Sequence, residues 1–541
     1  MTHSSSGRRR ALAGAIVMLV TLVSLVTIVA CVDLTVPNNN NPDRIRATST
    51  PGDVENLIAS TFQRWWPRVY GTTPTIMWSQ LAYEFSSPFV CLGSQDNAVE
   101  PRPAWNNTTV YSNAFVSSGT WLDLYGTISL ANDGLKALNG GIQIGTSGAN
   151  NSRARAFAKF MQGVATGYLA LMYDKAVILD ETTDVDTLIS PTYAPYTDVM
   201  AAAIAMLKAS IAISDTATFT LPNIGWVPGL SLTNKDLSRL GHTYVARFTA
   251  YVARSAAERA AVNWNDVITH SDAGITVDFA PIGTPLIFQD LYKQRAARLR
   301  TVIPSDFMRG NGWLIGPSDS TDAFKTWVAT PVANRTAFQV RTKDRRIQGS
   351  TGVGSQGKYF GYDSRITFYS AARGLYNASF YAFYHYGTGD SYESGPLVAI
   401  TRVELDLLKA EALIRLNRAA EAIPLINKTR VANGEISPVD INGPPDVPGC
   451  VPRKPTGGCG SLWDALKYEK RIEEAGVDGQ VAMWDARGWN TLAANTFLNF
   501  PIPGRELQIE RMPSYTNGGG GTFSAPTPDF EKCPVALPRC P

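Results

Sequence analysis

The sequence has little net charge, and its surplus lies at the start of the chain. Of 541 residues, 49 are Lys or Arg and 46 are Asp or Glu, a formal net charge of +3. Arg8, Arg9 and Arg10 are the only charged residues before position 31, so the remainder carries 46 charges of each sign. Because a nucleic-acid partner requires a basic surplus, we expect none.

Histidine is also scarce, which leaves little support for catalysis. Beyond residue 30 the chain contains His242, His270 and His385, and the first two lie in or beside expected helices. No G-x-S-x-G motif is present. The stretch 352–357 matches G-x-G-x-x-G, but it follows no apolar strand and opens no helix, so we interpret it as a loop. We therefore expect no enzyme activity and no cofactor.

One long uncharged run lies at the N-terminus. Residues 11–30 follow the three arginines, contain no charge and end in Ala30, directly before Cys31. This order is typical of a secretory signal peptide. A Cys after a small residue resembles the lipobox of bacterial lipoproteins, in which the cysteine begins the mature chain and carries lipid. An uncleaved signal anchor is the alternative, since about 20 apolar residues can span a bilayer, but it requires no cysteine there. We expect no later stretch to cross a membrane.

The remaining cysteines fall into two close pairs. Cys450 and Cys459 lie in a Gly/Pro-rich loop, and Cys533 and Cys540 lie in a Pro-rich tail. In an exported protein this predicts the disulfides Cys450–Cys459 and Cys533–Cys540, with Cys91 left over. A zinc site is the weaker alternative, because the spacings are not C-x₂-C and no histidine is near, so we expect no metal.

Apolar residues at helical spacing predict a mainly α fold. The expected helices are 51–66, 121–138, 152–173, 198–213, 237–257, 264–270, 397–416, 419–432 and 461–475. The pair 397–432 has about the 34-residue length of one tetratricopeptide unit. We count up to four such hairpins, which should stack because one alone cannot bury its apolar face.

Composition divides the chain into six regions. They are a signal peptide (1–30), a lipidated Cys with a polar leader (31–50), a helical region (51–274), an irregular, partly β, aromatic-rich lobe (275–395), C-terminal helical hairpins (396–516) and a Gly/Pro-rich tail (517–541).

Four charged residues near the C-terminus have two interpretations. Glu469, Glu473, Asp485 and Arg487 contain the carboxylates that a glycoside hydrolase would need. Charges on one helix that face a Trp-rich segment more often form structural ion pairs, which is the interpretation we favour.

Aromatic residues in loops are the best candidates for ligand contact. A sugar ring has an apolar face of C–H groups on which a flat aromatic ring can stack. Trp105 and Trp313 are the strongest candidates, because an Arg and an Asn flank each of them. Each such ring on its own is more often part of a core than of a binding surface. The candidate ligand-binding residues are Phe89, Trp105, Trp313, Trp327 and Tyr359.

Several stretches, in this order, resemble the RagB/SusD family of nutrient-binding outer-membrane lipoproteins. They are the lipobox Cys31 and its Asn/Pro-rich leader, a first helix ending in Trp65-Trp66, the stretches 408–422 and 425–430, the acidic helix 469–473, the segment 484–489, and Pro501-Ile502-Pro503 with the Glu506-Leu507 that follows. The likeness covers nearly the whole chain after Cys31.

The resemblance implies a fold of four tetratricopeptide-like units and a loop-rich lobe with the ligand site. It implies a SusC-like TonB-dependent transporter barrel as partner, with the lipid-anchored chain as a hinged lid at the cell surface. Family ligands are mostly glycans, sometimes peptides, but 275–395 carries no family-wide motif and so does not specify one. An exported lipoprotein glycoside hydrolase on a helical scaffold is the alternative, and a scaffold that binds only proteins is a third, weaker one.

The lipid anchor gives a first prediction. Replacing Cys31 with Ala should release the protein from the membrane or block its processing, because the acyl chains attach through that sulfur. Membrane fractionation and the mass of the mature chain measure both effects. A Cys31→Ala variant that stays membrane-bound at unchanged mature mass would show that something else anchors the protein.

Overall fold

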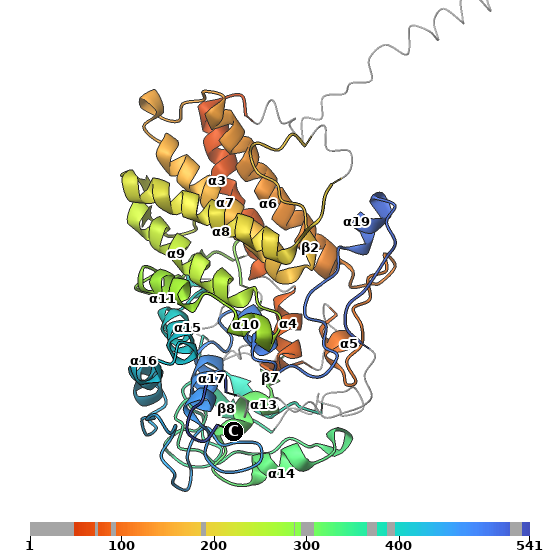
Figure 1. Ribbon diagram of the computed structural model, residues 1–541, viewed down its shortest axis with the longest axis vertical. Helices are drawn as coiled ribbons and strands as arrows, with labels where there is room; N and C mark the ends of the chain where they lie inside the picture. Colours follow the sequence, from red (N-terminus) through yellow and green to blue (C-terminus); the bar gives the residue numbers. More distant parts are fainter. Residues whose placement is uncertain are drawn as a thin grey trace, which may run out of the picture. The chain divides into compact units, whose positions relative to one another are not determined.

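Helices that pack one against the next in chain order dominate the computed structural model (Figure 1). The structure describes residues 48–70, 74–87, 93–185, 191–285, 287–290, 292–293, 308–364, 376–386, 395–519 and 533–540, so the predictions for Cys31, Phe89 and Cys91 lie outside the described residues. The chain divides into two compact units, residues 1–49 and 50–541, and every helix and strand below belongs to the second.

The stack consists of helices that contact their neighbours in sequence order. They are α3 (Pro51–Val69), α6 (Phe115–Asn139), α7 (Asn151–Met172), α8 (Tyr196–Thr216), α9 (Asn234–Tyr251), α11 (Trp264–Asp272), α15 (Arg402–Arg415), α16 (Ala419–Ala432) and α17 (Leu462–Glu473). The pairs α7/α8, α9/α11 and α15/α16 are the helical hairpins that the sequence predicts. The mainly α fold class is therefore confirmed.

Small residues on α7 allow its neighbours to approach closely. A Cβ atom on Gly163 would lie 2.8 Å from Leu207 of α8, and one on Gly167 would lie 2.0 Å from the ring of Phe248 on α9. Both distances are shorter than atoms tolerate, so glycine is required at both positions. The apolar side chains of these helices form the largest core of the molecule.

Side-chain caps fix where several helices begin. Thr233 and Asp236 form a capping box at the start of α9, and Ser461 and Asp464 form another at the start of α17. Each cap satisfies backbone N–H groups that have no partner inside the helix.

Four expected helix boundaries are wrong. Helix α6 begins at Phe115 and not at residue 121, since a turn ending at Ala114 leads directly into it. Helix α3 does not stop before Pro67 but continues to Val69, since a proline so near the end removes only one hydrogen bond. The expected helix 237–257 breaks after Tyr251, and Ser255 caps a separate helix α10 (Ala256–Ala260). Residues 397–401 are extended, because Leu397 and Ala399 donate backbone hydrogen bonds to residues 281 and 279.

Helix α8 is long and apolar enough to cross a membrane, by length and composition only. The expectation that no stretch after residue 30 meets this criterion is therefore wrong. The helix contacts both α7 and α9 and buries residues such as Val199, Met200 and Leu207, as a core helix does.

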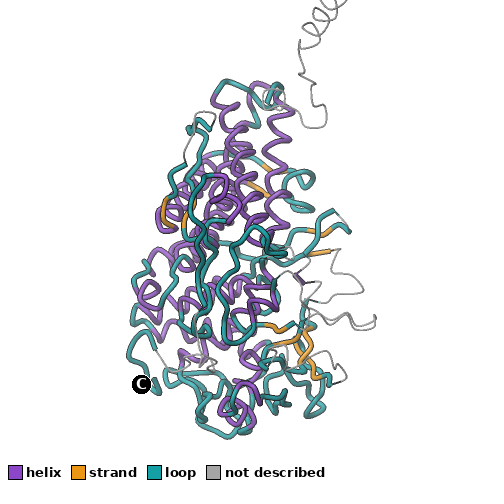
Figure 2. Tube along the Cα trace, turned by 90° about the vertical axis from the view of Figure 1, so that its right-hand side faces the viewer, coloured by secondary structure: helices purple, strands orange, loops and turns teal. Residues whose placement is uncertain are grey.

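Loops and short elements make up the described residues between 275 and 395 (Figure 2). Within the described residues the strands form five antiparallel pairs: β1 (Phe85–Ser86) with β7 (Arg309–Gly310), β2 (Lys175–Ala176) with β3 (Ala194–Pro195), β4 (Thr220–Leu221) with β5 (Leu232–Thr233), β6 (Ile282–Gly283) with β10 (Gly395–Pro396), and β8 (Phe360–Tyr362) with β9 (Tyr381–Phe383). The short helices are α4 (Thr75–Leu81), α5 (Ser94–Ala98), α13 (Gly312–Ile315), α14 (Ala323–Ala329), α18 (Gly479–Gly488) and α19 (Gly504–Ile509), with 3₁₀ turns at Thr146–Gly148, Gly316–Ser318 and Val332–Asn334.

The structure contains both disulfides that the cysteine spacing predicts. Cys450 is bonded to Cys459, and Cys533 is bonded to Cys540. Each bond closes a loop of fewer than ten residues, so its effect is local.

Buried charge joins the lobe to the C-terminal helices. The guanidinium of Arg346 pairs with Asp344 at 2.7 Å, with Glu469 of α17 at 2.5 Å and with Glu473 of α17 at 2.7 Å. Arg430 of α16 pairs with Glu469 from the other side at 3.2 Å. All five side chains are buried. The Arg346 guanidinium holds the pKa of Asp344 below its usual value despite that burial.

A second buried cluster joins α10 to α15, α17 and α18. Arg259 pairs with Glu411 of α15 at 2.7 Å and with Asp485 of α18 at 3.0 Å, and Lys470 of α17 also pairs with Asp485. The ion-pair interpretation of Glu469, Glu473 and Asp485 is thus confirmed. Arg487 differs, because its guanidinium donates to the backbone carbonyls of residues 171, 251 and 498.

Removing the central cation of the first cluster should unfold the protein at lower denaturant concentration. In Arg346→Met, three carboxylates lose their main partner inside the protein. We expect the free energy of unfolding, measured with urea, to fall by about 3–5 kcal/mol.

The matched control is Lys358→Met, which breaks the exposed pair of Lys358 with Glu435 at 2.8 Å. Solvent screens that pair, so its loss should leave the unfolding curve almost unchanged. Equal unfolding midpoints for wild type and Arg346→Met would contradict the structural role of the cluster.

Candidate functional site

The aromatic residues predicted to contact ligand lie in the interior of the molecule. Trp105 and Trp313 are 1% exposed, and Trp327 and Tyr359 are 4% exposed. The interpretation of Trp105 and Trp313 as exposed rings outside the core is therefore wrong, because each packs against other side chains. A ring buried in this way offers no face to a ligand. Phe89, the fifth candidate, stays a prediction.

Trp313 and Trp327 belong to an aromatic cluster in the lobe. Their ring centroids lie 5.3 Å apart, and Phe324 and Tyr83 pack against Trp313 at 5.8 and 6.4 Å. The guanidinium of Arg335 lies 4.5 Å from the centroid of the Trp327 ring. These contacts hold together a part of the lobe that has little regular secondary structure.

Tyr359 and Trp105 also have structural partners. The hydroxyl of Tyr359 donates to Glu473 at 3.0 Å, and its ring stacks on His385 with centroids 3.6 Å apart. Trp105 packs against Phe500 at 4.7 Å, and its backbone N–H donates to the carbonyl of Asn517. Tyr359 thereby belongs to the Arg346 cluster. The contacts of Trp105 hold its loop against residues 500–517.

A small polar recess lies next to the aromatic cluster. Its lining residues come from the end of α4, from β1, from α5 and from two loops of the lobe, and they are Gln80, Tyr83, Phe85, Ser86, Ala98, Asn311 and Asn377. The recess has a volume of about 20 Å³, enough for one water molecule or one hydroxyl group of a larger ligand.

Strand pairing and hydrogen bonds fix the walls of the recess. Because β1 pairs with β7, Asn311 lies opposite β1, and its amide nitrogen donates to the hydroxyl of Ser86 at 2.9 Å. Its amide oxygen accepts from the N–H of Trp313 at 3.0 Å and so caps α13. Asn377 donates to Glu100 at 2.8 Å and accepts from Arg335 at 3.0 Å.

Gln80 contributes the unsatisfied group of this recess. Its side chain is 3% exposed, and its amide nitrogen Nε2 has no hydrogen-bond partner in the described part of the chain. Most buried polar groups in folded proteins are paired, so such an atom requires an explanation. An acceptor oxygen on a bound molecule would supply the missing partner.

Burial keeps the acidic group beside the recess close to neutral. It raises the pKa of Glu84 to about 7, although Tyr292 and the N–H of Gly476 donate to this carboxylate. Burial also raises the pKa of Tyr83, whose hydroxyl donates to Glu100 at 2.6 Å. Two buried acidic residues, Glu84 and Glu100, therefore lie beside the recess, and burial disfavours the charged form of Glu84.

Metal binding has no support among the described residues, because they contain no group of three or more His, Cys, Asp or Glu side chains that could hold an ion. The carboxylates considered for glycoside hydrolysis, Glu469 and Glu473, are buried and paired with Arg346.

Most of the recess could not be predicted from the sequence. Asn311 stands out there only as a neighbour of Trp313, and no motif marks Gln80, Ser86 or Asn377. These residues lie on separate segments that only the folded lobe brings together. The useful signal is an unpaired buried amide, which is visible only in a structure.

The fold of the helical stack and the loop-rich lobe is similar to that of several solved structures described as SusD-like. A SusD superfamily protein from Bacteroides thetaiotaomicron VPI-5482 superposes with a TM-score of 0.54 over 82% of this chain and 90% of its own, at 14% identity. One from Bacteroides vulgatus ATCC 8482 gives a TM-score of 0.54 over 85% and 97%, at 13% identity. A SusD-like carbohydrate binding protein from Bacteroides fragilis NCTC 9343 gives 0.52 over 82% and 87%, at 15% identity.

The chain therefore has the SusD-like fold, and the resemblance inferred from its motifs is confirmed at the level of the fold. No protein-family model matches the sequence, and no curated protein does.

The buried position of Trp313 reverses the expected effect of its removal. A loop-tip tryptophan could be truncated at little cost to stability. In this core, Trp313→Ala should lower the free energy of unfolding by about 3–5 kcal/mol, because the vacated volume cannot be refilled. Phe115→Ala, at a ring that is 41% exposed, is the aromatic control and should cost far less. If Trp313→Ala unfolds like wild type but no longer binds ligand, the prediction is contradicted, and Trp313 contacts the ligand.

Proposed function

We propose that this protein is a glycan-binding outer-membrane lipoprotein that captures its ligand and passes it to a SusC-like TonB-dependent transporter. The observation that carries the proposal is the recess in the lobe, where Gln80 has an unsatisfied amide among hydroxyl and amide side chains.

The chemistry of the recess supports a glycan. Sugar hydroxyl groups both donate and accept hydrogen bonds, so one of them can accept from Nε2 of Gln80, which has no partner among the described residues. The recess takes about one hydroxyl group, so it would bind one corner of a sugar while the rest of the glycan lies outside. The description of the Bacteroides fragilis protein as carbohydrate binding supports the same ligand class.

Export and anchoring are parts of the same proposal. The charged and then apolar N-terminus ending in Ala30-Cys31 supports cleavage and lipidation at Cys31. Each CH₂ of a buried acyl chain contributes about 0.8 kcal/mol, so several chains would hold the protein at the outer membrane permanently. The SusD-like fold supports a transporter barrel as the partner.

The state of the carboxylates Glu469 and Glu473 supports a protein that binds glycans and does not cleave them. Glu469 and Glu473 are buried and paired with Arg346, so neither is free to protonate or attack a glycosidic bond. No observation favours the glycoside hydrolase alternative.

A glycan and peptide array on residues 32–541 tests the proposal. We expect one glycan class to bind, and we expect Gln80→Ala to weaken that binding about 3- to 10-fold, the effect of one lost hydrogen bond. Protein stability should change little, because Nε2 of Gln80 has no partner within the described fold.

Gln143→Ala is the matched control, since Gln143 is an exposed glutamine in the turn between α6 and α7, remote in sequence from every residue of the recess. Its affinity should equal that of wild type. Absence of glycan binding, or a Gln80→Ala variant that binds normally, would contradict the proposed site. Turnover of a glycan that Glu469→Gln or Glu473→Gln abolishes would contradict the binding function itself.

A further inference from the structure

A second cavity, larger than the recess, lies between the start of α6 and the start of α19. Figure 1 labels both helices. Its volume is about 270 Å³, near the lower end of the range of about 300–1,000 Å³ for small-molecule sites. The walls come from the loop that begins at Trp105, from the first turn of α6 and from residues 503–505, and none of its lining residues belongs to the recess around Gln80.

Asn107 connects the loop that begins at Trp105 with residues 502–515 by hydrogen bonds. Its amide nitrogen donates to the carbonyls of Ile502 at 2.9 Å and Tyr515 at 3.0 Å, and its amide oxygen accepts from the N–H of Gly504 at 3.0 Å. A Cβ atom at position 504 would lie 2.0 Å from the carbonyl oxygen of Asn107, so glycine is required there. The cavity is thus a fixed feature of the fold, formed before any ligand binds.

Two buried polar atoms in the wall have no partner. Trp105 and Ser117 both line the cavity, and both are 1% exposed. Neither the indole N–H of Trp105 nor the hydroxyl of Ser117 has a hydrogen-bond partner among the residues that the structure describes. A molecule bound in the cavity would supply the missing hydrogen-bond partners of both groups.

The charge of the wall selects an anion. Arg505 is the only charged residue in the lining, and its side chain is exposed. The 25-residue helix α6 begins at Phe115 with no acidic residue in its first turn and no side-chain cap, so no side chain of the helix itself offsets its positive end. The nearby acids are outside the lining: Asp96 accepts hydrogen bonds from Tyr111 and Asn113, and Glu506 follows Arg505 in sequence.

The remaining lining supplies groups that recognise hydroxylated rings. Asparagine, threonine and serine side chains surround the cavity, and Phe115 lies at its edge with 41% of its surface exposed. Amides and hydroxyls bond to sugar hydroxyl groups, and an exposed aromatic ring packs against the apolar face of a sugar.

We propose that this cavity is a second ligand site that binds one acidic sugar ring, a hexuronate. Its carboxylate pairs with Arg505 at the open side, and its hydroxyl groups reach the amide and hydroxyl wall and the unpaired groups of Trp105 and Ser117. The proposal shares the ligand class of the proposed function but does not depend on the recess around Gln80.

Calorimetric titration of the full chain in detergent with D-glucuronate, D-glucose and acetate tests this site. We expect glucuronate to bind, glucose to bind at least about 10-fold more weakly, and acetate not to bind measurably. Arg505→Ala should reduce the affinity for glucuronate by about 10- to 100-fold, the effect of one lost charged hydrogen bond, down to that for glucose. Ser117→Ala should reduce it about 2- to 10-fold without loss of stability, because the hydroxyl has no partner in the described fold.

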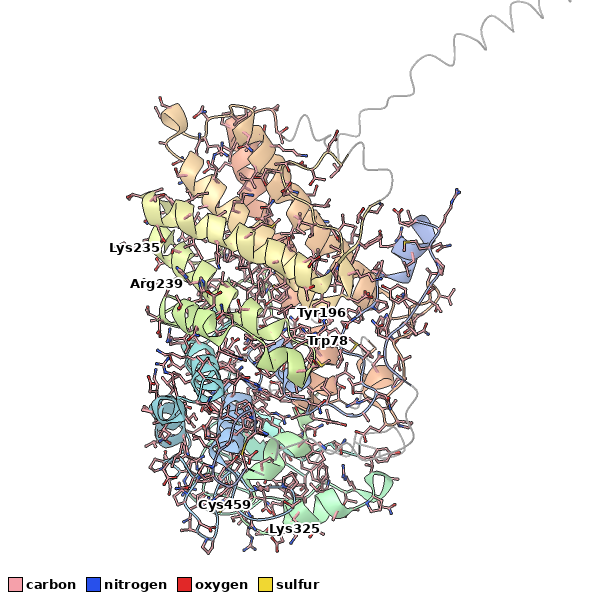
Figure 3. The ribbon with its side chains drawn as sticks, in the orientation of Figure 1. Trp78, Tyr196, Lys235, Arg239, Lys325 and Cys459 are labelled. Carbon is pink, nitrogen blue, oxygen red and sulfur yellow. A yellow bond between two sulfur atoms is a disulfide. The ribbon has the colours of Figure 1, made fainter. Side chains whose placement is uncertain are left out.

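Two control variants show whether glucuronate binds at this cavity. Lys235→Ala removes an exposed positive charge near the start of α9, where Figure 3 labels the residue, and should leave glucuronate binding unchanged. Gln80→Ala should also leave it unchanged, so a failure of the proposed function at the recess does not affect this result. The proposal is overturned if glucuronate fails to bind, if glucose binds equally well, if Arg505→Ala binds normally, or if Gln80→Ala abolishes binding while Ser117→Ala does not.

Discussion

The guanidinium of Arg346 lies where water does not reach, and the position of the loop-rich lobe depends on it. A buried cation is tolerated only when carboxylates surround it with good geometry, and Asp344, Glu469 and Glu473 do so at 2.5–2.7 Å. Two of these carboxylates belong to α17, whereas Arg346 belongs to the lobe. The lobe therefore has one energetically acceptable position against the C-terminal helices, because any displacement would leave buried charges unpaired.

The lobe's lack of regular structure explains why the aromatic rings that the sequence suggested as ligand contacts are buried. With few regular strands, the lobe cannot satisfy its backbone by sheet pairing, and side chains replace that pairing. Arg335 donates to the carbonyls of residues 327, 328 and 330, while its guanidinium lies over the ring of Trp327. Asn311, which flanks Trp313 and suggested sugar recognition, also has a structural role, because it donates to Ser86 and accepts from the N–H of Trp313. The tryptophans fill the space between the loops.

The sequence predicts those parts of the molecule that depend on periodicity and on local composition. Helical spacing located α7, α8 and α16 to within about three residues, and short cysteine spacings located both disulfides. Where prediction failed, a contact distant in sequence decided the outcome. Leu397 is extended because Pro281 accepts its hydrogen bond, and Trp105 is buried because Phe500 packs on it. Gln80 and Asn311 lie more than 200 positions apart, so no local pattern could bring them into one recess.

Polar side chains in such a lobe serve structure first, which changes how a binding site is recognised. Arg335, Asn107 and Asn377 have the right chemistry for glycans, yet the fold already occupies their hydrogen-bonding groups. Among the atoms that the described fold leaves unpaired, three belong to residues that line the two cavities: the amide nitrogen of Gln80 in the recess, and the indole N–H of Trp105 and the hydroxyl of Ser117 in the larger cavity. Because an unpaired buried donor costs free energy in the empty protein, a ligand that pairs it gains that energy on binding. The two proposed ligand sites therefore rest on unpaired polar atoms whose residues also line a cavity, and not on the abundant aromatic rings.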